Sequence, residues 1–341
     1  MLSGKKTFLY RGESMIELNE LKKQLKELEK TFIRVNYPKT IVIELTNRCN
    51  INCIQCARSN ITRKIGDMDI SLFKKIIEDI AEHSPDSRVW LSNYGEPLMI
   101  GKEKISGMLS YAKNTGLTDT YMNTNAVLLD REISEVLIDG GLDHLLISVD
   151  GYSKKVYESI RVGADRDNVY RNILEFKKIK DKKNYGKPSL EVQFVLMKDN
   201  ESEFEQYKSF WTELGIPIKL RSCITWGGNI SGKSIIDDSL DRIVCGFTYS
   251  TCNITWDGVV TACGSDVNAD FAAGNLNEQS VSEIWDYKER NFTNYHFNHR
   301  FDKLPEFCRD CVDWQYIGTV NYDEKGKRFK RSYEFLKSNS V

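Results

Sequence analysis

No apolar run in this sequence is long enough to span a membrane, and the apolar stretch near the N-terminus is too short for a signal peptide. Neither sign of charge dominates, since 48 Lys and Arg residues stand against 49 Asp and Glu residues. The sequence therefore has no charge bias that points to nucleic acid or to an anionic membrane. We expect a cytoplasmic protein with neither a nucleic-acid nor a membrane partner.

Histidine is scarce as well. The four histidines, His83, His144, His296 and His299, show no spacing typical of a metal site or a catalytic triad. Cysteine is not scarce. The chain has 9, but with 341 residues, 40% of them hydrophobic, it can build a core without a disulfide framework. We expect reduced thiols in a reducing compartment, and such thiols are available as metal ligands.

Strand-like and helical runs alternate through the middle of the chain. The predicted strands cover residues 41–45, 89–91, 120–122, 145–149, 190–197 and 216–221. The predicted helices cover residues 71–83, 102–115, 131–140, 168–180 and 201–214. Six strand–helix units predict an α/β fold in which a parallel sheet with right-handed crossovers closes into a partial barrel. Ahead of it, apolar residues at spacings of 3 and 4 predict an amphipathic helix over 14–32, docked on the main domain and ended before Pro38.

Three cysteines, Cys49, Cys53 and Cys56, follow the first predicted strand on one tight loop. In parallel-stranded barrels the reactive groups gather at the C-terminal ends of the strands. Three thiolates at Cys-x3-Cys-x2-Cys spacing can hold three irons of a four-iron cluster, which leaves the fourth iron without a protein ligand. A structural zinc site is the alternative, but it usually needs four ligands, and no fourth cysteine or histidine lies near this loop. An iron–sulfur cluster is therefore favoured.

The last hundred residues hold a second cysteine set, which consists of Cys245, Cys263, Cys308 and Cys311. Asp257-Gly258 between β-rich runs predicts a hairpin that places Cys245 and Cys263 near one another across paired strands. Four thiolates complete the coordination of either a second cluster or a zinc ion, and ligand chemistry alone favours zinc. Cys252 stands at an alternating strand position, and we interpret it as a small core residue.

The first cysteine loop closely resembles that of the radical S-adenosylmethionine (SAM) enzymes, in which SAM chelates the iron that lacks a protein ligand. The run at 92–98, Ser-Asn-Tyr-Gly-Glu-Pro-Leu, resembles the family's Gly-Gly-Glu motif with Tyr94 in place of the first glycine. The resemblance implies that Gly95 and Glu96 receive the methionine amino group, since a cationic amine needs carbonyl and carboxylate acceptors. A further departure is Gln55, where family members often carry an aromatic residue.

The resemblance extends to the ends of the third and fourth predicted strands. The cofactor-binding residues that it implies there are Thr124, Asn125, Ser148, Asp150 and Arg161. Strand parity points Ser148 and Asp150 to one face, where they suit ribose hydroxyls or the cofactor carboxylate. Arg161 suits a bidentate pair with that carboxylate. Met197, together with Phe194 and Leu196, offers an apolar wall for adenine.

The segment around the second cysteine set resembles the twitch domain, a shortened SPASM domain, of radical SAM dehydrogenases. This resemblance favours an auxiliary four-iron cluster over zinc. It implies a single auxiliary cluster, because the additional cysteines of a full SPASM domain are absent. The implied layout is an N-terminal helix in 1–38, a partial (β/α)6 radical SAM barrel in 39–228, a small cysteine-rich twitch-like hairpin domain in 240–315 and a C-terminal tail in 316–341.

The family implies reductive cleavage of SAM, with an electron from a flavodoxin- or ferredoxin-type donor, to a 5'-deoxyadenosyl radical that abstracts hydrogen from the substrate. We favour a dehydrogenase for a small polar molecule such as a sugar or aminocyclitol, whose substrate radical passes an electron to the auxiliary cluster. Parity puts Lys219, Arg221 and Cys223 on one face of the sixth strand, where Arg221 suits a substrate hydroxyl.

Three alternatives stay open. An epimerase would use Cys223 as a hydrogen-atom donor to the substrate radical, whereas a buried thiol is the plainer interpretation of this residue. A peptide substrate is the second, although the region before Pro38 is small for a peptide-recognition domain. A non-catalytic cluster scaffold or electron carrier is the third, and the Gly95-Glu96 motif argues against it.

Overall fold

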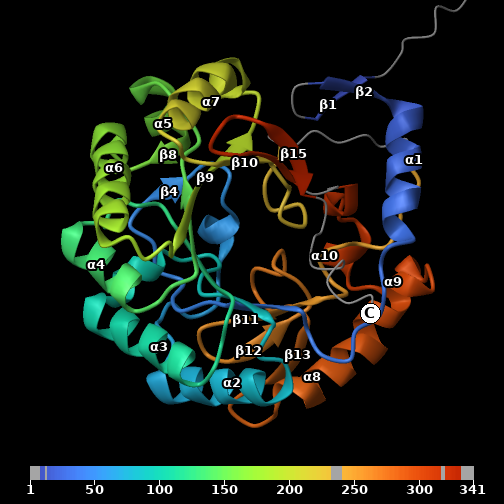
Figure 1. Ribbon diagram of the computed structural model, residues 1–341. Coiled ribbons are helices and arrows are strands. Elements are labelled where there is room, and N and C mark those ends of the chain that lie inside the picture. The colour runs from blue at the N-terminus through green and yellow to red at the C-terminus, as the bar shows by residue number, and fades with distance from the viewer. Residues whose placement is uncertain (1–7, 12–13, 232–239, 316–318, 332–341) are drawn as a thin grey trace, which may run out of the picture.

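The computed structural model describes residues 8–11, 14–231, 240–315 and 319–331, and its centre is an 11-stranded sheet. Figure 1 shows this sheet curling around the middle of the molecule, with helices outside it. Its parallel strands are β11 (Thr251–Ile254), β3 (Thr40–Ile43), β5 (Arg88–Trp90), β6 (Thr120–Thr124), β7 (His144–Ser148), β9 (Ser189–Leu196) and β10 (Ile218–Ser222). Antiparallel strands continue both edges, β12 (Val259–Thr261) and β13 (Ala272–Asn275) beyond β11, and β14 (Thr319–Tyr322) and β15 (Arg328–Arg331) beyond β10.

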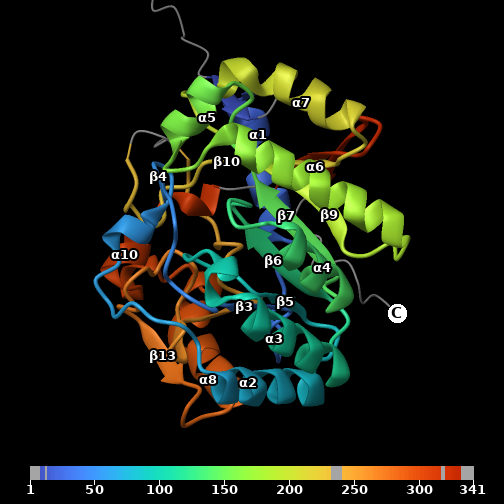
Figure 2. The same ribbon diagram turned by 90° about the vertical axis from the view of Figure 1, so that its left-hand side faces the viewer.

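Helices cover the outer face of the parallel strands. They are α2 (Ile70–His83), α3 (Lys102–Asn114), α4 (Arg131–Asp139), α6 (Arg166–Lys183) and α7 (Phe204–Glu213), with the shorter α5 (Lys154–Ile160) before α6. Seen from the side in Figure 2, α7, α6, α4, α3 and α2 follow one another from the top of the view to the bottom. The predicted α/β class and the partial (β/α)6 barrel are confirmed. No helix in the described part of the chain is long and apolar enough to cross a membrane.

Local sequence explains how these helices form and pack. In α2 the Asp69 side chain caps the N-terminus by accepting a hydrogen bond from the Ser71 amide. The residues of α2 that are buried against the sheet recur at helical spacing and are Leu72, Phe73, Ile76, Ile77 and Ile80. Each such side chain contributes about 1.5–3 kcal/mol when fully buried. The helix is therefore held mainly by its apolar face.

Aromatic side chains of three neighbouring strands, β5, β6 and β7, stack on one another inside the barrel. The rings of Trp90 and Tyr121 stack with centroids 4.6 Å apart, and those of Tyr121 and His144 stack at 3.9 Å. The Lys219 ammonium lies 5.1 Å from the Trp90 ring centroid. Side chains on one face of a strand recur every second position, so these residues lie on the same face as Ser92, Asn123 and Ser148 and below them, and we call them the aromatic floor.

The N-terminal helix differs from its prediction in length and in docking site. Residues 14–17 form strand β2 (Ser14–Glu17), paired with β1 (Phe8–Arg11), so α1 covers only Leu18–Glu29. Its Leu25 is buried with Ile243, Cys245 and Trp314, and the Glu29 carboxylate accepts a hydrogen bond from the Val244 amide at 2.6 Å. The helix therefore packs on the cysteine-rich part of the chain and not on the barrel.

The cysteine-rich part is joined to the barrel through the sheet. β11 pairs in parallel with β3, with Thr251 opposite Thr40, and the β11–β12 hairpin turns at Gly258, whose φ of 92° favours glycine. This hairpin confirms the predicted turn, and Cys252 on it is buried in the main core, as interpreted. The helices that follow are α8 (Val281–Lys288), α9 (Asn294–Phe297) and α10 (Glu306–Arg309).

The predicted C-terminal tail, residues 316–341, contains two strands in its described part, 319–331. β14 pairs antiparallel with β10, with Asn321 opposite Lys219. The edge of β10 would otherwise present unpaired backbone groups, and β14 pairs with them. Short helical turns complete the described chain as η1 (Ala57–Asn60), η2 (Pro97–Ile100), η3 (Glu201–Glu203), η4 (Glu289–Thr293), η5 (Phe301–Lys303) and η6 (Asp313–Gln315).

Candidate active site

A cavity opens at the C-terminal ends of the barrel strands, above the aromatic floor. Most of the predicted site residues line it, namely Cys49, Cys53, Cys56, Gly95, Glu96, Thr124, Asn125, Ser148, Arg161, Arg221 and Cys223. These residues come from the loop after β3 and from the ends of β5, β6, β7 and β10, with Arg161 from the segment after α5. The cavity thus occupies the place where parallel barrels carry their reactive groups.

The first cysteine loop is clamped at both ends. The side-chain nitrogen of Asn47 donates to the Lys64 carbonyl at 2.8 Å, and the side-chain oxygen of Asn47 accepts from the Gly66 backbone amide at 2.9 Å. Arg48 forms a bidentate pair with Asp67, with distances of 2.9 and 2.5 Å. Farther along, β4 (Asn52–Cys53) pairs with β8 (Arg161–Val162), which sets Cys53 opposite Arg161. The loop is held by backbone and side-chain contacts on both sides of its cysteines.

Each sulfur of this loop receives an N–H group. The backbone amides of Ile51 and Arg58 donate to Cys49 and Cys56, and an Arg161 N–H lies 3.7 Å from the Cys53 sulfur. Burial raises the pKa of the Cys53 thiol to about 12, while the Arg161 charge acts in the opposite direction. Hydrogen bonds to sulfur are the usual environment of cluster-ligating thiolates. The donor set therefore fits the three-cysteine side of a four-iron cluster.

Gly95 lies against the backbone of the cysteine loop. A Cβ atom at this position would stand 2.0 Å from the Thr46 carbonyl oxygen and 2.8 Å from that of Arg48. The next amide, of Glu96, donates to the Arg48 carbonyl at 2.8 Å. Only glycine allows this approach, so the motif after β5 fixes the position of the cysteine loop.

The Glu96 carboxylate joins the ends of two neighbouring strands. It accepts hydrogen bonds from the Thr124 hydroxyl at 2.6 Å, the Asn125 amide at 2.7 Å and the Leu98 amide at 3.2 Å. Burial raises its pKa to about 7, against these hydrogen bonds. The Asn125 side chain also lies 3.8 Å from the Cys49 sulfur. Glu96, Thr124 and Asn125 thus form one network beside the cysteine loop.

Asp150 and Arg161 form a buried ion pair behind the cavity wall. An Asp150 oxygen accepts from Arg161 and from the Gln55 side chain, both at 2.5 Å, and its other oxygen accepts from the Val195 amide at 2.7 Å. Ser148 does line the cavity, and its hydroxyl donates to the Asn123 side chain at 3.0 Å. Asp150 therefore positions Arg161 and Gln55 and is not itself part of the wall.

Two groups on this wall lack internal partners. The Arg161 Nε and the Gln55 side-chain oxygen are buried with no hydrogen-bond partner among the described residues. Since buried polar groups are normally satisfied, these atoms are suited to a bound polar molecule. One signal in the sequence pointed to Gln55, its position directly before Cys56. No signal pointed to Asn123 and Gln193, which also line the cavity.

The fifth strand presents a different side chain to the cavity from those predicted. Val195 lines it, while Phe194 lies on the outer face, with its ring centroid 5.3 Å from Phe204 and 4.7 Å from Tyr207. Alternation along β9 causes this division, and Leu196 also joins the outer core. Met197 is buried in a cluster with Ile160, Val195 and Cys223 and stands outside the cavity wall.

The second cysteine set comes together in the C-terminal part of the chain. Besides the effect of burial, its thiols lie near enough to raise one another's pKa: Cys308 and Cys263 raise that of Cys245, and Cys245 raises that of Cys311. The prediction that paired hairpin strands bring Cys245 and Cys263 together is wrong. β11 begins at Thr251, so Cys245 lies in the turns before the hairpin and not on a paired strand. Among the described residues, no three His, Cys, Asp or Glu side chains converge on a single-ion site.

The sulfurs of this set also receive N–H groups. Backbone amides donate to Cys245 from Phe247, to Cys263 from Ser265 at 3.4 Å, and to Cys311 from Asp313 at 3.4 Å. The Arg242 guanidinium lies 3.6 Å from the Cys308 sulfur. Burial raises the pKa of the Cys263 thiol to about 11. This donor set fits the ligation of an iron–sulfur cluster for the same reason as the first.

His296 is a neighbour of this set that the sequence did not single out. Its Nε2 lies 3.4 Å from the Cys308 sulfur, and burial lowers the pKa of the imidazole to about 3. The sequence offered no signal, because the two residues belong to different helices and meet only through the fold.

Family comparisons agree with both cysteine sites, the one in the barrel and the one in the C-terminal part of the chain. The sequence model of the Radical SAM superfamily matches residues 43–210, and that of SPASM, an iron-sulfur cluster-binding domain, matches residues 245–312. The chain belongs to the radical SAM superfamily. Its two domains imply a 4Fe–4S cluster with SAM in the barrel and auxiliary iron–sulfur ligation in the C-terminal part.

Two curated relatives illustrate the range of the family. The tungsten-containing aldehyde ferredoxin oxidoreductase cofactor-modifying protein of Pyrococcus furiosus is 24% identical over 322 residues, 80% of this radical SAM chain and 87% of that protein. A GTP 3',8-cyclase of Clostridium botulinum is 26% identical over 216 residues, 62% of this chain and 63% of the cyclase.

Solved structures share the fold. BtrN in complex with AdoMet and 2-DOIA has a TM-score of 0.55 at 19% identity, covering 80% of this chain and 92% of BtrN. Streptococcus suis SuiB bound to the precursor peptide SuiA has a TM-score of 0.60 at 14% identity, covering 81% of this chain and 72% of SuiB. At these identities the likeness concerns the fold alone.

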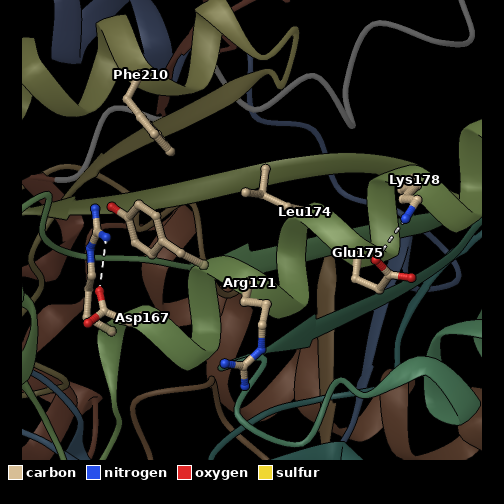
Figure 3. A pocket seen from close by; sticks show the side chains of 8 residues that line it. Asp167, Arg171, Leu174, Glu175, Lys178 and Phe210 are labelled. Carbon is tan, nitrogen blue, oxygen red and sulfur yellow. Dashed lines mark hydrogen bonds and ion pairs between the residues drawn. The ribbon is translucent and has the colours of Figure 1, made fainter.

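A second pocket of this radical SAM protein lies on the outside of the barrel, between α6 and α7. Figure 3 shows Phe210 of α7 above Leu174 of α6, with Glu175 and Lys178 paired at 3.8 Å along the helix. The Arg166 guanidinium packs 3.6 Å from the centroid of the Tyr170 ring. None of the predicted site residues lines this pocket, which belongs to the helical outer layer.

Proposed function

We propose that this protein reductively cleaves SAM and oxidises a small polar substrate, with the second cysteine set holding the cluster that accepts the electron. The observation that carries the proposal is one cavity in which the three-cysteine loop shares its walls with Arg221 and Cys223 of the sixth barrel strand. The alternative of a non-catalytic scaffold leaves that shared cavity without a use.

The residues divide into binding and positioning roles. Cys49, Cys53 and Cys56 would hold three irons, and SAM bound to the cluster supplies a 5'-deoxyadenosyl radical on reduction by a flavodoxin- or ferredoxin-type donor. The Gly95 segment holds the loop in place, while Ser148 and the unpartnered Nε of Arg161 suit the polar ends of SAM. Asp150 fixes the orientation of Arg161.

The oxidation balances with one hydrogen atom, one proton and one electron. The hydrogen atom would go from a substrate C–H bond to the deoxyadenosyl carbon and the proton from the adjoining hydroxyl to solvent. Cys245, Cys263, Cys308 and Cys311 would hold the cluster that takes up the electron. Arg221 on the cavity wall suits the hydroxyl oxygen, where a guanidinium stabilises developing negative charge. The product is then a carbonyl compound two hydrogens lighter than the substrate.

Two curated relatives favour a small molecule, since they are named for a cofactor-modifying activity and for a GTP cyclase. BtrN, which shares the fold, was solved with 2-DOIA. The fold of SuiB, solved with a precursor peptide, keeps a peptide substrate as the alternative.

Replacing Gly95 by alanine should disable the site. The added Cβ would meet the Thr46 carbonyl at 2.0 Å, so the cysteine loop or the β5 end must shift. We expect formation of 5'-deoxyadenosine by the Gly95→Ala protein to fall about a hundredfold, because a displacement of about 1 Å can cost that much. Gly107→Ala is the matched control, since a Cβ there meets nothing within 4 Å. Equal activity in the two variants would contradict the assigned role of Gly95.

Epimerisation is the second candidate, because Cys223 lines the cavity and a thiol can return a hydrogen atom. Oxidation needs no such donor, so Cys223→Ala should keep most activity and still give a product two hydrogens lighter. Turnover in D2O, followed by mass spectrometry of the product, checks this. A mass-neutral product with one solvent deuterium, lost in Cys223→Ala, would establish epimerisation instead.

A further inference from the structure

Tyr94, the residue that departs from the family's first glycine, lies between the two cysteine sets. It is buried, at 4% exposure, and its hydroxyl donates to the carbonyl of Gly264, directly after Cys263. Its ring packs in one apolar cluster with Cys56 and Val267. Burial raises the pKa of the phenol far above its ordinary value, and the nearby Cys263 and Cys56 thiols add to that rise. One side chain therefore borders both ligand loops.

Trp226 makes a second connection beside the first. Its indole N–H donates to the Gln55 carbonyl at 2.9 Å, directly before Cys56, and its ring centroid lies 5.4 Å from that of Tyr94. The loop that carries Trp226 is tied to the other cysteine set. The amides of Thr225 and Gly227 donate to the Asp313 carboxylate at 2.6 and 2.9 Å.

Asp313 completes this second connection. Its own backbone amide donates to the Cys311 sulfur at 3.4 Å, so the same residue that anchors the Trp226 loop also faces a ligand sulfur. Two routes thus run between the sets, one from Cys56 through Tyr94 to Cys263 and one from Cys56 through Trp226 and Asp313 to Cys311. The two rings pack in one apolar cluster, and both also line the cavity.

We propose that Tyr94 and Trp226 form an aromatic bridge that fixes the separation of the two cluster sites and carries an electron from one to the other. This inference rests on the proposed function, in which both cysteine sets hold clusters. In the transfer the second cluster is oxidised by one electron and the first is reduced by one, so the electron gained from a substrate becomes available for another SAM cleavage. No proton needs to move with it.

The test measures electron redistribution without any substrate. Anaerobically reconstituted holoprotein receives less than one electron per chain from a flash-photoreduced deazaflavin, and freeze-quenched EPR spectra follow the two reduced-cluster signals over time. We expect Tyr94→Leu and Trp226→Leu each to slow the exchange about tenfold or more, because the smaller side chain leaves a gap in the packed path. Tyr94→Phe keeps the ring, and we expect it to stay closer to wild type than Tyr94→Leu.

Trp256→Leu is the matched control. Its indole also joins the C-terminal domain to the segment after the first cysteines, by donating to the Lys64 carbonyl at 3.0 Å, and this hydrogen bond reaches no ligand cysteine. Exchange in this variant should match wild type. Two clusters in every protein with unchanged exchange in both Leu variants would overturn the bridge alone. Wild-type protein with only one cluster would overturn the proposed function, and the bridge with it.

Discussion

Replacing Cys49, Cys53 and Cys56 together by alanine is expected to abolish SAM cleavage and to lower the iron content of anaerobically reconstituted protein from about eight to about four atoms per chain. The reason is the separation of the two ligand sets. The loop after β3 supplies every sulfur of the first site, each with its own N–H donor, and the second set supplies none of them. Iron analysis checks the expected loss of four irons, and chromatography of 5'-deoxyadenosine checks the loss of SAM cleavage.

Cys223→Ala is the matched control for the triple variant. Cys223 lines the same cavity but packs with apolar neighbours, so its loss should leave about eight irons and an intact cofactor reaction. Cleavage of SAM by the triple variant would show that the loop after β3 is not the reactive site.

Replacing Cys308 and Cys311 together by alanine is expected to separate SAM cleavage from substrate oxidation. The first loop and its clamps at Asn47 and Arg48 lie in the barrel and lose no contact, so 5'-deoxyadenosine should still form. Turnover of substrate should collapse, because the substrate radical then has no acceptor for its electron. The iron content should fall to about four atoms per chain.

Cys252→Ala is the control for this double variant. Cys252 lies on β11 in the same part of the chain, but it is buried in the main hydrophobic core, so both clusters should be retained. Zinc in place of iron in anaerobically purified wild-type protein would contradict the electron-acceptor role. So would full oxidation of substrate by the double variant.

The parallel strands were predictable because their signal is local. Leu145–Ile147 is buried on both sides of the sheet, and Ile41 and Ile43 are buried on one side. Such short apolar runs alternate along the chain with segments of amphipathic helical period. Once the strands were predicted, the loops at their C-terminal ends were known as well. For this reason most of the cavity-lining residues could be named from the sequence. Glu96 was named for its carboxylate, and the structure adds that three chain donors already occupy it.

The remaining differences all involve partners that are distant in sequence. Nothing local to Leu25 indicates that α1 packs beside Cys245, and nothing in residues 319–322 indicates pairing with β10. Asp150 is similar. Strand parity gives its face but not the Arg161 and Gln55 side chains that take up its oxygens before a ligand can. The spacing of apolar residues predicts which side of an element is buried. These contacts depend instead on which distant segments the fold brings together.

The most direct test of radical oxidation follows the abstracted hydrogen. A panel of sugars and aminocyclitols, each deuterated at its carbinol positions, is incubated with reduced holoprotein and SAM, and the deoxyadenosine and product are analysed by mass spectrometry. We expect the true substrate to deliver one deuterium to each 5'-deoxyadenosine and to give a product lacking that deuterium and one further hydrogen. Deuterium transfer with a product of unchanged hydrogen count would contradict oxidation.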